Sequence, residues 1–320
     1  MTDKNQKAPD TANIDSEMII AELQADIEII KKNYSLWDEK NFSSRADVID
    51  DIEFHIIERI DGLFQNQSHA RELADLERDA EQVKLQLEKI NIDLFGRLRA
   101  KIQTGGCRGA AFRDMIEEFA GDSLKESADQ PAIGYDNLDV FVDGLFPIAT
   151  LPEETRAREP EMVFYQKTPA RIIFELVDKA NFNKEDVFYD LGSGLGQVGI
   201  LVNLLSEVRT RGVEFEPTYC DYASACATEL NLPDVQFINA DARKADYSDG
   251  TVFFMYTPFE GEMLREVLEK LQAASKDRAI KLFTYGPCSF QVGKQNWLKH
   301  ENRGGITIYK LAMFSNKTIK

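Results

Sequence analysis

Apolar residues in the first hundred positions recur every three or four residues, which is the period of amphipathic helices. The three stripes are Ile20, Leu23, Ile27, Ile30, Tyr34 and Trp37, then Ile49, Ile52, Ile56 and Ile60, and then Leu73, Leu76, Ala80, Val83, Leu87, Ile90 and Leu94. Residues 41–44 supply a break and an N-cap for the middle helix, and residues 65–68 supply the next break. The pattern predicts an antiparallel bundle or coiled-coil arm, whose stripes either pack within one chain or join two chains in a homodimer.

After residue 160 the pattern changes to short apolar runs that alternate with helical stretches. Runs at 187–191, 210–215, 235–239, 251–256 and 279–285 predict strands, and segments 297–300 and 306–314 predict a terminal hairpin. We therefore expect an α/β fold with a seven-stranded sheet whose last strand is antiparallel. The expected domains are an acidic helical bundle or coiled-coil arm (residues 1–120), a linker (121–134) with a lead-in helix (135–148) ahead of residue 160, and an α/β domain (161–320).

The first run ends in three alternating glycines, Gly192, Gly194 and Gly196, and a helix follows. A strand, a glycine turn and a helix N-terminus let a nucleoside-bearing ligand lie against bare backbone. The acid at Asp190 and the G-x-G-x-G spacing differ from the G-x-G-x-x-G fingerprint of dinucleotide-binding folds. The pattern is typical of class I S-adenosylmethionine-dependent methyltransferases, which have a Rossmann-like sheet; a tight strand–helix connection without a ligand is the alternative.

Acidic side chains follow the next two strands. A carboxylate at Glu214 can accept hydrogen bonds from both ribose hydroxyls, and Glu216 is the competing candidate. Asp241, after the third strand, is placed to bind an adenine amino group, although acids also end strands in ordinary turns. Because ligands of open α/β sheets bind outside the carboxyl ends of the strands, these positions predict one shared site.

The fourth strand ends in Tyr256-Thr257-Pro258-Phe259, which we take as the catalytic segment. Methyl transfer from a sulfonium is an in-line displacement that depends on holding the acceptor close to the methyl group. Tyr256 and Phe259 are expected to form an aromatic collar that attracts a cationic centre. Ordinary packing of the two rings at a strand end is the alternative.

In these segments the chain resembles the disruptor-of-telomeric-silencing family, the non-SET histone lysine methyltransferases. The run DLGSGLGQV, Asp190 to Val198, is similar to that family's cofactor loop and includes its glutamine as Gln197. Other matching positions are Tyr165 and Thr168 of the Tyr-x-x-Thr segment that closes over the cofactor, the ribose acid Glu214 and the adenine-side acid Asp241.

This chain departs from the family pattern at two places. Ala242 stands where the family has an aromatic residue, and Tyr256-Thr257-Pro258-Phe259 stands where the family has Asn-Asn-Phe-Ala-Phe. The resemblance covers roughly residues 160 to 290 and implies S-adenosylmethionine as the cofactor and a protein lysine as the methyl acceptor. Whether Thr257 or Tyr256 takes the place of the family asparagine is open at this point.

The net charge and the cysteine content limit the kinds of partner, metal site and compartment that are expected. The chain has 38 Lys and Arg against 55 Asp and Glu, a net charge of −17, which disfavours nucleic acid as the main partner and suits a basic protein segment. Cys107, Cys220, Cys226 and Cys288 form no Cys-x-x-Cys pair, so neither zinc nor a disulfide framework is expected, and no metal is assigned. Reduced thiols and the lack of a long apolar run predict a cytoplasmic protein without a membrane partner.

The expected function is methyl transfer to an amino group, with a protein lysine side chain as the first choice. A small-molecule or RNA methyltransferase of the same fold is the alternative within the enzyme class. A non-catalytic adaptor, in which a cofactor-binding domain supports a scaffolding coiled coil, is the alternative outside it.

Overall fold

The computed structural model describes residues 11–64, 69–126, 134–148, 150–302 and 304–316, and it divides the chain into two compact units, Met1–Gly96 and Arg97–Lys320. The boundary falls inside one long helix, α4 (Ala70–Gln103), and not near residue 120 as the sequence suggested. The reason lies in the helices that follow, because α5 (Ala110–Glu126) and α6 (Asn137–Leu145) pack together and α5 also packs on α8 (Gln197–Ser206) of the second unit.

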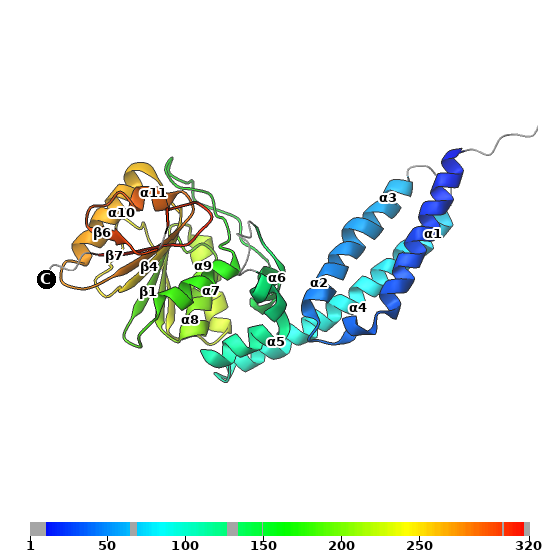
Figure 1. Ribbon diagram of the computed structural model, residues 1–320, viewed down its shortest axis with the longest axis horizontal. Helices are drawn as coiled ribbons and strands as arrows, with labels where there is room; N and C mark the ends of the chain where they lie inside the picture. The colour runs from blue at the N-terminus through cyan, green and yellow to red at the C-terminus, as the bar shows by residue number, and fades with distance from the viewer. Residues whose placement is uncertain (1–10, 65–68, 127–133, 149, 303, 317–320) are drawn as a thin grey trace, which may run out of the picture. The chain divides into compact units, whose positions relative to one another are not determined.

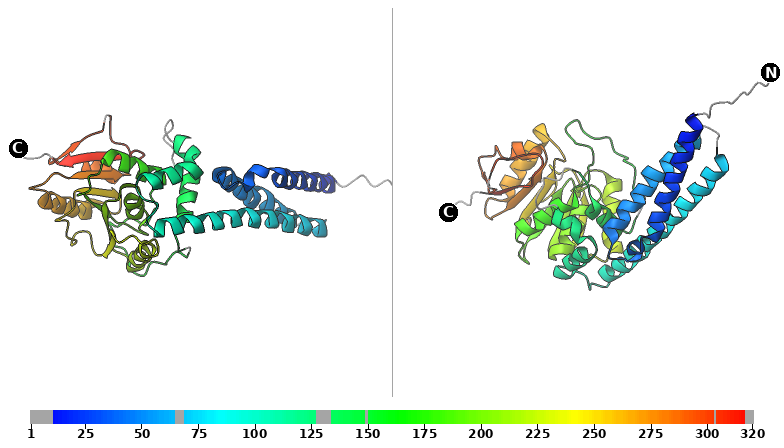
Figure 2. Two further views of the ribbon diagram at one scale, coloured as in Figure 1. Left: turned by 90° about the horizontal axis from the view of Figure 1, so that it is seen from below. Right: turned by 45° about the vertical axis from the view of Figure 1, so that its right-hand side comes forward.

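The first unit is a helical bundle (Figures 1 and 2). Its elements are α1 (Thr11–Lys32), the short η1 (Tyr34–Trp37), α2 (Phe42–Asp51), the π-helical η2 (Ile52–Ile57), α3 (Glu58–Phe64) and the first part of α4. The helices α1 and α4 run antiparallel to one continuous middle helix made of α2, η2 and α3. All three predicted stripes contribute to one core within the chain, in which Leu23, Ile60 and Leu87 are fully buried. The predicted break lies slightly earlier than residues 41–44, because residues 38–41 are non-helical and α2 already begins at Phe42. Asn41 makes no side-chain cap and instead donates from Nδ2 to the carbonyl of Ser35 (2.9 Å).

The middle helix of the bundle contains one wide turn, η2. Its buried residues Ile52 and Ile56, and Ile60 in the following helix, are each four positions apart. In a regular α-helix such steps drift by roughly 40° each, because one turn takes 3.6 residues. A π-helical turn, with its i→i+5 bonds, counters that drift and keeps the three isoleucines on one face.

A buried arginine lies in the first turn of α2, beside the connection from α1. Arg45 is 0% exposed, and burial lowers the pKa of its guanidinium. It donates to Asn91 Oδ1 (2.7 Å) and to the backbone carbonyls of Leu36 (3.0 Å), Asp38 (2.7 Å) and Glu39 (3.2 Å). The helical period predicted an apolar core and gave no sign of this buried cation.

The second unit contains the seven-stranded sheet predicted from the sequence, in the order β3-β2-β1-β4-β5-β7-β6. The strands are β1 (Val187–Leu191), β2 (Arg209–Glu214), β3 (Val235–Asn239), β4 (Val252–Tyr256), β5 (Lys281–Tyr285), β6 (Leu298–His300) and β7 (Ala312–Asn316). The first five are parallel, and β7 is antiparallel to both β5 and β6. The predicted α/β fold, with seven strands and an antiparallel last strand, is confirmed.

Helices cover both faces of this sheet (Figure 1). The helices α7 (Ala170–Ala180), α8 (Gln197–Ser206) and α9 (Pro217–Glu229) lie on one side, and α10 (Gly261–Ala274) and α11 (Cys288–Val292) lie on the other. Two apolar layers result. One of them joins Tyr189, Phe253 and Leu282 of the strands to Leu264 and Leu268 of α10.

The region between the expected domains is more helical than predicted. Residues 121–126 belong to α5 and not to a linker, while residues 127–133 of that predicted linker lie outside the described residues. The lead-in helix is present as α6, and a reciprocal capping box between Asp136 and Asp139 starts it. Asp139 also accepts a hydrogen bond from the backbone of Ala170 (2.8 Å), so α6 is fastened to the start of α7.

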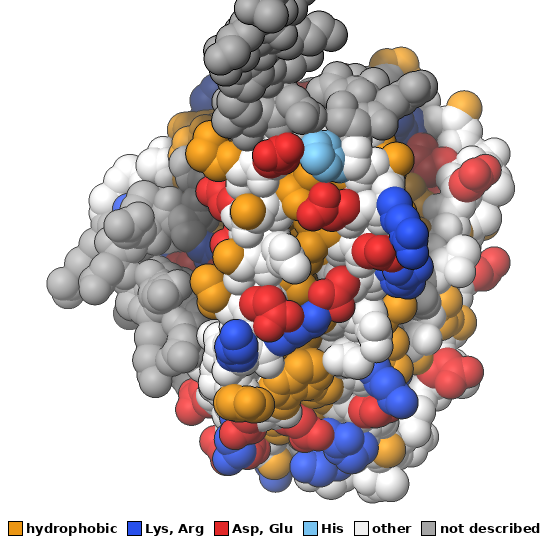
Figure 3. Space-filling model, turned by 90° about the vertical axis from the view of Figure 1, so that its right-hand side faces the viewer, with side chains coloured by type: hydrophobic (Ala, Val, Ile, Leu, Met, Phe, Trp, Pro, Cys, Tyr) orange, Lys and Arg blue, Asp and Glu red, His pale blue; other side chains and the backbone are white. Residues whose placement is uncertain are grey.

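Surface composition is mixed. Acidic and basic side chains alternate with hydrophobic ones over the face drawn in Figure 3. The cysteines are buried and unpaired in the described ranges. Among the helices that the structure describes, none combines the length and the apolar character needed to cross a bilayer.

Candidate functional site

A cavity lies at the carboxyl ends of β1, β2, β3 and β4, where the parallel register brings the strand ends together. It encloses about 1010 Å³, part of it open to solvent. Eight of the nine predicted cofactor-binding residues line it: Tyr165, Thr168, Asp190, Gly192, Gly194, Gln197, Glu214 and Asp241. The ninth, Gly196, is not among the lining residues and serves the backbone of the loop instead.

The three glycines of the loop have positive φ angles of 75°, 50° and 82°. A Cβ at Gly194 would lie 2.3 Å from Cε2 of Tyr165, and one at Gly192 would lie 2.2 Å from Cβ of Pro258. At Gly196 a Cβ would meet the side chains of Ala223 and Phe237 at 2.6 Å. Backbone conformation and close packing therefore both require glycine at these positions.

Glu214 lies at the end of β2 with its carboxylate against the glycine loop. Its Oε2 accepts from the backbone N–H of Gly194 (2.7 Å), and its Oε1 accepts from that of Glu216 (2.8 Å). Burial raises the pKa of Glu214, although these backbone bonds oppose the shift. Each carboxylate oxygen can accept a further hydrogen bond, so the predicted binding of a ribose diol is compatible with this geometry.

Glu216, the competing candidate for the ribose, has a different role. Its carboxylate accepts from the Thr155 hydroxyl (2.7 Å) and the backbone of Arg156 (2.8 Å), and it caps α9 through Thr218. Burial acts against ionisation of Glu216, but these hydrogen bonds outweigh it and lower its pKa to about 2. Glu216 thus holds residues 155–156 against the end of β2.

Asp241 is paired within the protein. Arg243 donates to it from the backbone N–H (2.9 Å) and from Nη2 (2.8 Å), and the same Nη2 also reaches Glu159 at 2.8 Å. The Arg243 hydrogen bonds lower the pKa of Asp241 and keep it ionised. Asp241 lines the cavity, so it remains the candidate for the adenine side, held in place by an arginine that the sequence analysis did not single out.

Two polar side chains near the loop have unused hydrogen-bonding capacity in the part of the chain that the structure describes, and a buried carboxyl group lies beside them. Both amide atoms of Gln197 and the hydroxyl of Ser193 are buried without a partner. Asp190 is 3% exposed, and burial, followed by the charge of Glu214, raises its pKa well above the usual range. Buried polar groups are normally hydrogen-bonded, so this cluster fits a ligand that supplies donors, acceptors and positive charge. S-adenosylmethionine, with its sulfonium, ammonium and carboxylate groups, is such a ligand.

Residues 155–168 cross the cavity as an extended segment that is fastened at several points. Glu161 accepts from the backbone of Glu262 (3.0 Å) and Met263 (2.6 Å) at the start of α10, and Val163 donates to the carbonyl of Pro258 (3.0 Å). Tyr165 follows, packed on Gly194 and edge-on to Tyr219 (5.6 Å between ring centroids), and Thr168 is buried. Of these contacts the sequence indicated only Tyr165 and Thr168.

The predicted catalytic segment divides in two. Tyr256 and Phe259 line the cavity together with Pro258. Thr257 does not line it: its Oγ1 donates to the carbonyl of Tyr285 (3.0 Å) and accepts from the backbone N–H of Cys288 (3.2 Å). Thr257 is therefore not placed to touch an acceptor, contrary to the prediction.

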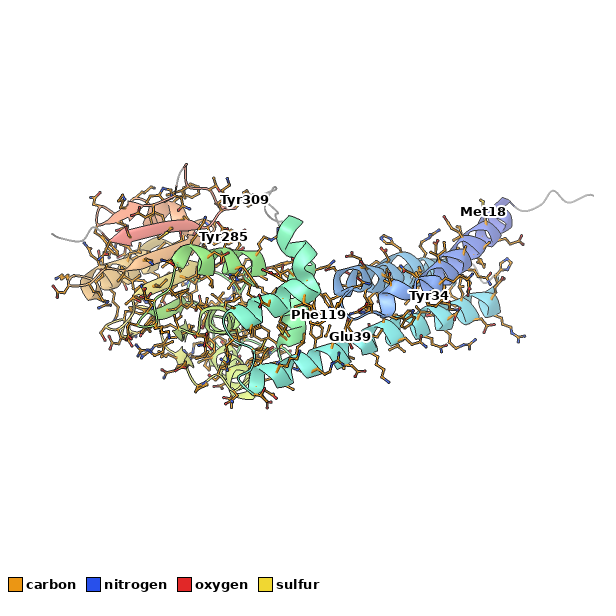
Figure 4. The ribbon with its side chains drawn as sticks, turned by 60° about the horizontal axis from the view of Figure 1, so that its bottom comes forward. Met18, Tyr34, Glu39, Phe119, Tyr285 and Tyr309 are labelled. Carbon is orange, nitrogen blue, oxygen red and sulfur yellow. The ribbon has the colours of Figure 1, made fainter. Side chains whose placement is uncertain are left out.

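Tyr256 is paired with a second tyrosine that the sequence analysis did not assign. The register of β4 and β5 sets Tyr256 beside Tyr285, with ring centroids 4.8 Å apart. Burial raises the pKa of Tyr256 to about 12 and raises that of Tyr285 as well. Tyr309 lies close to Tyr285 in Figure 4. The acceptor side of the cavity is thus aromatic and phenolic.

Comparison with known proteins supports this assignment of the site. Residues 162–254 match the family model described as "Histone methylation protein DOT1". The matched segment contains Tyr165, the glycine loop, Glu214 and Asp241, and it ends within β4, before Tyr256. No curated protein matches the chain.

Several solved structures are similar to about half of this chain. One is an RNA methyltransferase from Salinibacter ruber in complex with S-adenosyl-L-homocysteine (22% identity, 47% of this chain and 92% of that one, TM-score 0.37). Another is precorrin-6y C5,15-methyltransferase from Geobacter metallireducens (14% identity, 51% and 94%, TM-score 0.38). A third is magnesium protoporphyrin IX methyltransferase from Synechocystis with bound SAM (15% identity, 46% and 76%, TM-score 0.35).

The strand order, the glycine loop with its strand-end acids, and the family match over the same residues agree with one another. The predicted cofactor, S-adenosylmethionine, is confirmed with them. The second unit is a class I S-adenosylmethionine-dependent methyltransferase domain whose cofactor segment is similar to that of the DOT1 family.

Proposed function

We propose that this chain transfers the methyl group of S-adenosylmethionine to an amino group of a protein, a lysine side chain. The observation that carries the proposal is the position of Tyr256, Pro258 and Phe259, which line the cavity directly beside the cofactor loop. Pro258 packs on Gly192, so the acceptor side adjoins the place where the cofactor lies. The match of residues 162–254 to a histone methylation family supports the same choice of acceptor.

Methyl transfer requires mainly that this site position the amine and exclude water from it. When bound, the cofactor supplies an electrophilic methyl group on a sulfonium. An amine attacks only as the free base, and its ordinary pKa near 10.4 must fall for that form to be present at neutral pH. Burial among aromatic side chains disfavours the ammonium form and lowers that pKa.

Tyr256 would hold the amine and would not act as a base. With a pKa of about 12, raised first by burial, its hydroxyl stays protonated at neutral pH. A neutral phenol can still accept a hydrogen bond from the amine N–H and can direct the nitrogen lone pair towards the methyl group. Phe259, 4% exposed, forms an apolar wall next to it.

The acceptor partner is inferred from charge. The net charge of −17 favours encounters with a basic protein segment, as a lysine-rich substrate would present. We place the protein in the cytoplasm, where its unpaired cysteines would stay reduced. A homodimer through the N-terminal helices is a further proposal for how the acidic first unit contributes.

The test is to incubate the protein and tritiated S-adenosylmethionine with a fractionated cell lysate. Gly194→Arg is the inactive variant, since even a Cβ at that position would meet the Tyr165 ring at 2.3 Å. Gly305→Arg is the matched control, because nothing lies within 4 Å of a Cβ there. We expect alkali-stable label in protein with wild type and with Gly305→Arg, and none with Gly194→Arg.

Other outcomes decide against the proposal. Label in the RNA or small-molecule fraction would retain the methyltransferase and reject the protein acceptor. Absence of label in every fraction, with cofactor binding confirmed by calorimetry, would favour the non-catalytic adaptor. Equal labelling by wild type and Gly194→Arg would reject the cofactor loop as the functional site.

A further inference from the structure

Thr257 has a backbone conformation that its residue type disfavours. Its φ is +42°, in the left-handed region, where a β-branched residue is an outlier and costs of order 1–3 kcal/mol. Pro258 follows it, and a residue before proline is additionally restricted. Such strain persists only where surrounding contacts impose it.

The contacts of Thr257 join the ends of two neighbouring strands. Its hydroxyl receives the N–H of Cys288 at 3.2 Å and donates to the carbonyl of Tyr285 at 3.0 Å, and so it fills the turn between β5 and α11. Gly286 makes room for it, since a Cβ there would lie 2.6 Å from Thr257 Oγ1. The bonded carbonyl is that of Tyr285, whose ring packs on Tyr256.

We propose that Thr257 is a positioning residue, which locks the Tyr256–Tyr285 ring pair into the geometry that seats the acceptor amine. This inference rests on the proposed amino-group methylation and assigns to Thr257 a role through its neighbours. The hydroxyl fixes the strand end that carries Tyr256 to the strand end that carries Tyr285, and each bond it makes is buried.

The ring pair is suited to such a seat. Tyr256 lines the cavity, and Tyr285 packs behind it at 4.8 Å with the planes inclined by 55°. Among the described residues the Tyr256 hydroxyl has no hydrogen-bond partner, and Tyr256 lines the cavity, so this hydroxyl is available to a ligand there. A displacement of one ring by about 1 Å can cost on the order of 100-fold in rate when the reacting atoms must be aligned.

Thr257→Val and Thr257→Ser separate the hydroxyl from the shape of the side chain. Valine keeps the β-branch and the volume but loses both hydrogen bonds, whereas serine keeps the hydroxyl. For each we would measure methyl transfer to n-butylamine, a mimic of the lysine side chain, together with the S-adenosylmethionine Kd by calorimetry. We expect Thr257→Val to lower kcat by about 10- to 100-fold with an unchanged cofactor Kd, and Thr257→Ser to restore it.

A second readout does not depend on catalysis. With 3-fluorotyrosine incorporated in place of Tyr285, the fluorine NMR signal reports the ring position in the free protein. We expect the signal to move in Thr257→Val and to stay in place in Thr257→Ser. A signal that stays in place in Thr257→Val would overturn the inference.

The two readouts separate the failure of this inference from that of the proposed function. If the wild type methylates neither n-butylamine nor any protein, the proposed function fails, and the fluorine signal alone then judges the positioning role. If kcat and cofactor affinity fall together in Thr257→Val, the residue only supports the fold of the site, and the inference is rejected.

Discussion

The two units of this protein treat buried polar groups in opposite ways. In the first unit Arg45 is completely buried, and it donates to four acceptors around it. In the second unit Gln197 and Ser193 are also buried, yet their side chains have no partner among the described residues, and Asp190 lies beside them. A satisfied polar group fixes a structure, whereas an unsatisfied one beside a cavity indicates where a ligand completes the set.

The largest effect is expected at the satisfied site. Arg45→Met removes the four hydrogen bonds that the guanidinium donates to Asn91 and to three backbone carbonyls, and it should lower the free energy of unfolding of the first unit by about 3 kcal/mol. Trp37 packs against the core of that unit and Trp297 lies in the second, so Trp37 fluorescence in a Trp297→Phe background follows the first unit during urea unfolding. Lys84→Ala is the control, because its ion pair with Glu53 is partly exposed and should contribute about 0.5 kcal/mol.

A smaller, pH-dependent effect is expected at Glu216, the satisfied carboxylate of the second unit. Its folded-state pKa is lowered to about 2, so the stability that it contributes is complete above its unfolded pKa of about 4.3 and is lost as the pH falls towards 2. Glu216→Gln should therefore cost about 1–2 kcal/mol at neutral pH and almost nothing near pH 2. Trp297 fluorescence in a Trp37→Phe background follows the unfolding of the second unit at each pH. A loss of stability in Glu216→Gln that is the same at every pH would contradict the lowered pKa of Glu216.

The smallest change in stability is expected at the unsatisfied site. Gln197→Leu replaces an unpartnered buried amide with an apolar group of similar size, so the free protein should keep its stability or gain up to about 1 kcal/mol. The S-adenosylmethionine Kd should nevertheless rise about tenfold, because the hydrogen bonds between the amide and the bound cofactor are then lost. Thermal unfolding measures the stability of the variant, and calorimetry on the same sample measures its S-adenosylmethionine Kd. Lower stability with an unchanged Kd would show that Gln197 supports the fold and does not bind the ligand.

The sequence predicted those features that follow a repeating pattern of residues or a motif with a fixed local geometry. Strand β1 was located at both ends, and the glycine loop with Asp190 and Glu214 was predicted because spacing alone places these residues at one edge of a parallel sheet. The sequence could not predict Arg45, since its acceptors are mostly backbone carbonyls that any residue supplies. It also could not separate Thr257 from Tyr256, because a positive φ at Thr257 turns the hydroxyl towards β5.

The sequence also did not predict roles that depend on contacts between residues far apart in the chain, because no local pattern indicates such contacts. Glu159 reaches Arg243 across 84 positions, and Glu161 caps a helix about a hundred positions away. A weak local signal existed for Arg243 alone, which stands two residues after Asp241 and pairs with it directly. Glu214 and Glu216 were equal candidates in the sequence, and only the partners of Glu216 distinguish them.

The wide turn η2 in the first unit has a consequence for how this helix tolerates changes in length. The turn takes up an additional residue, and so it brings the buried isoleucines at 52, 56 and 60 closer to one line along the inner face. Deletion of the exposed Phe54 would leave steps of three and four, the ordinary rhythm of an α-helix, and the same isoleucines would still face inward. The π-helical turn therefore accommodates one inserted residue, and a chain that is one residue shorter here is expected to keep the same bundle core.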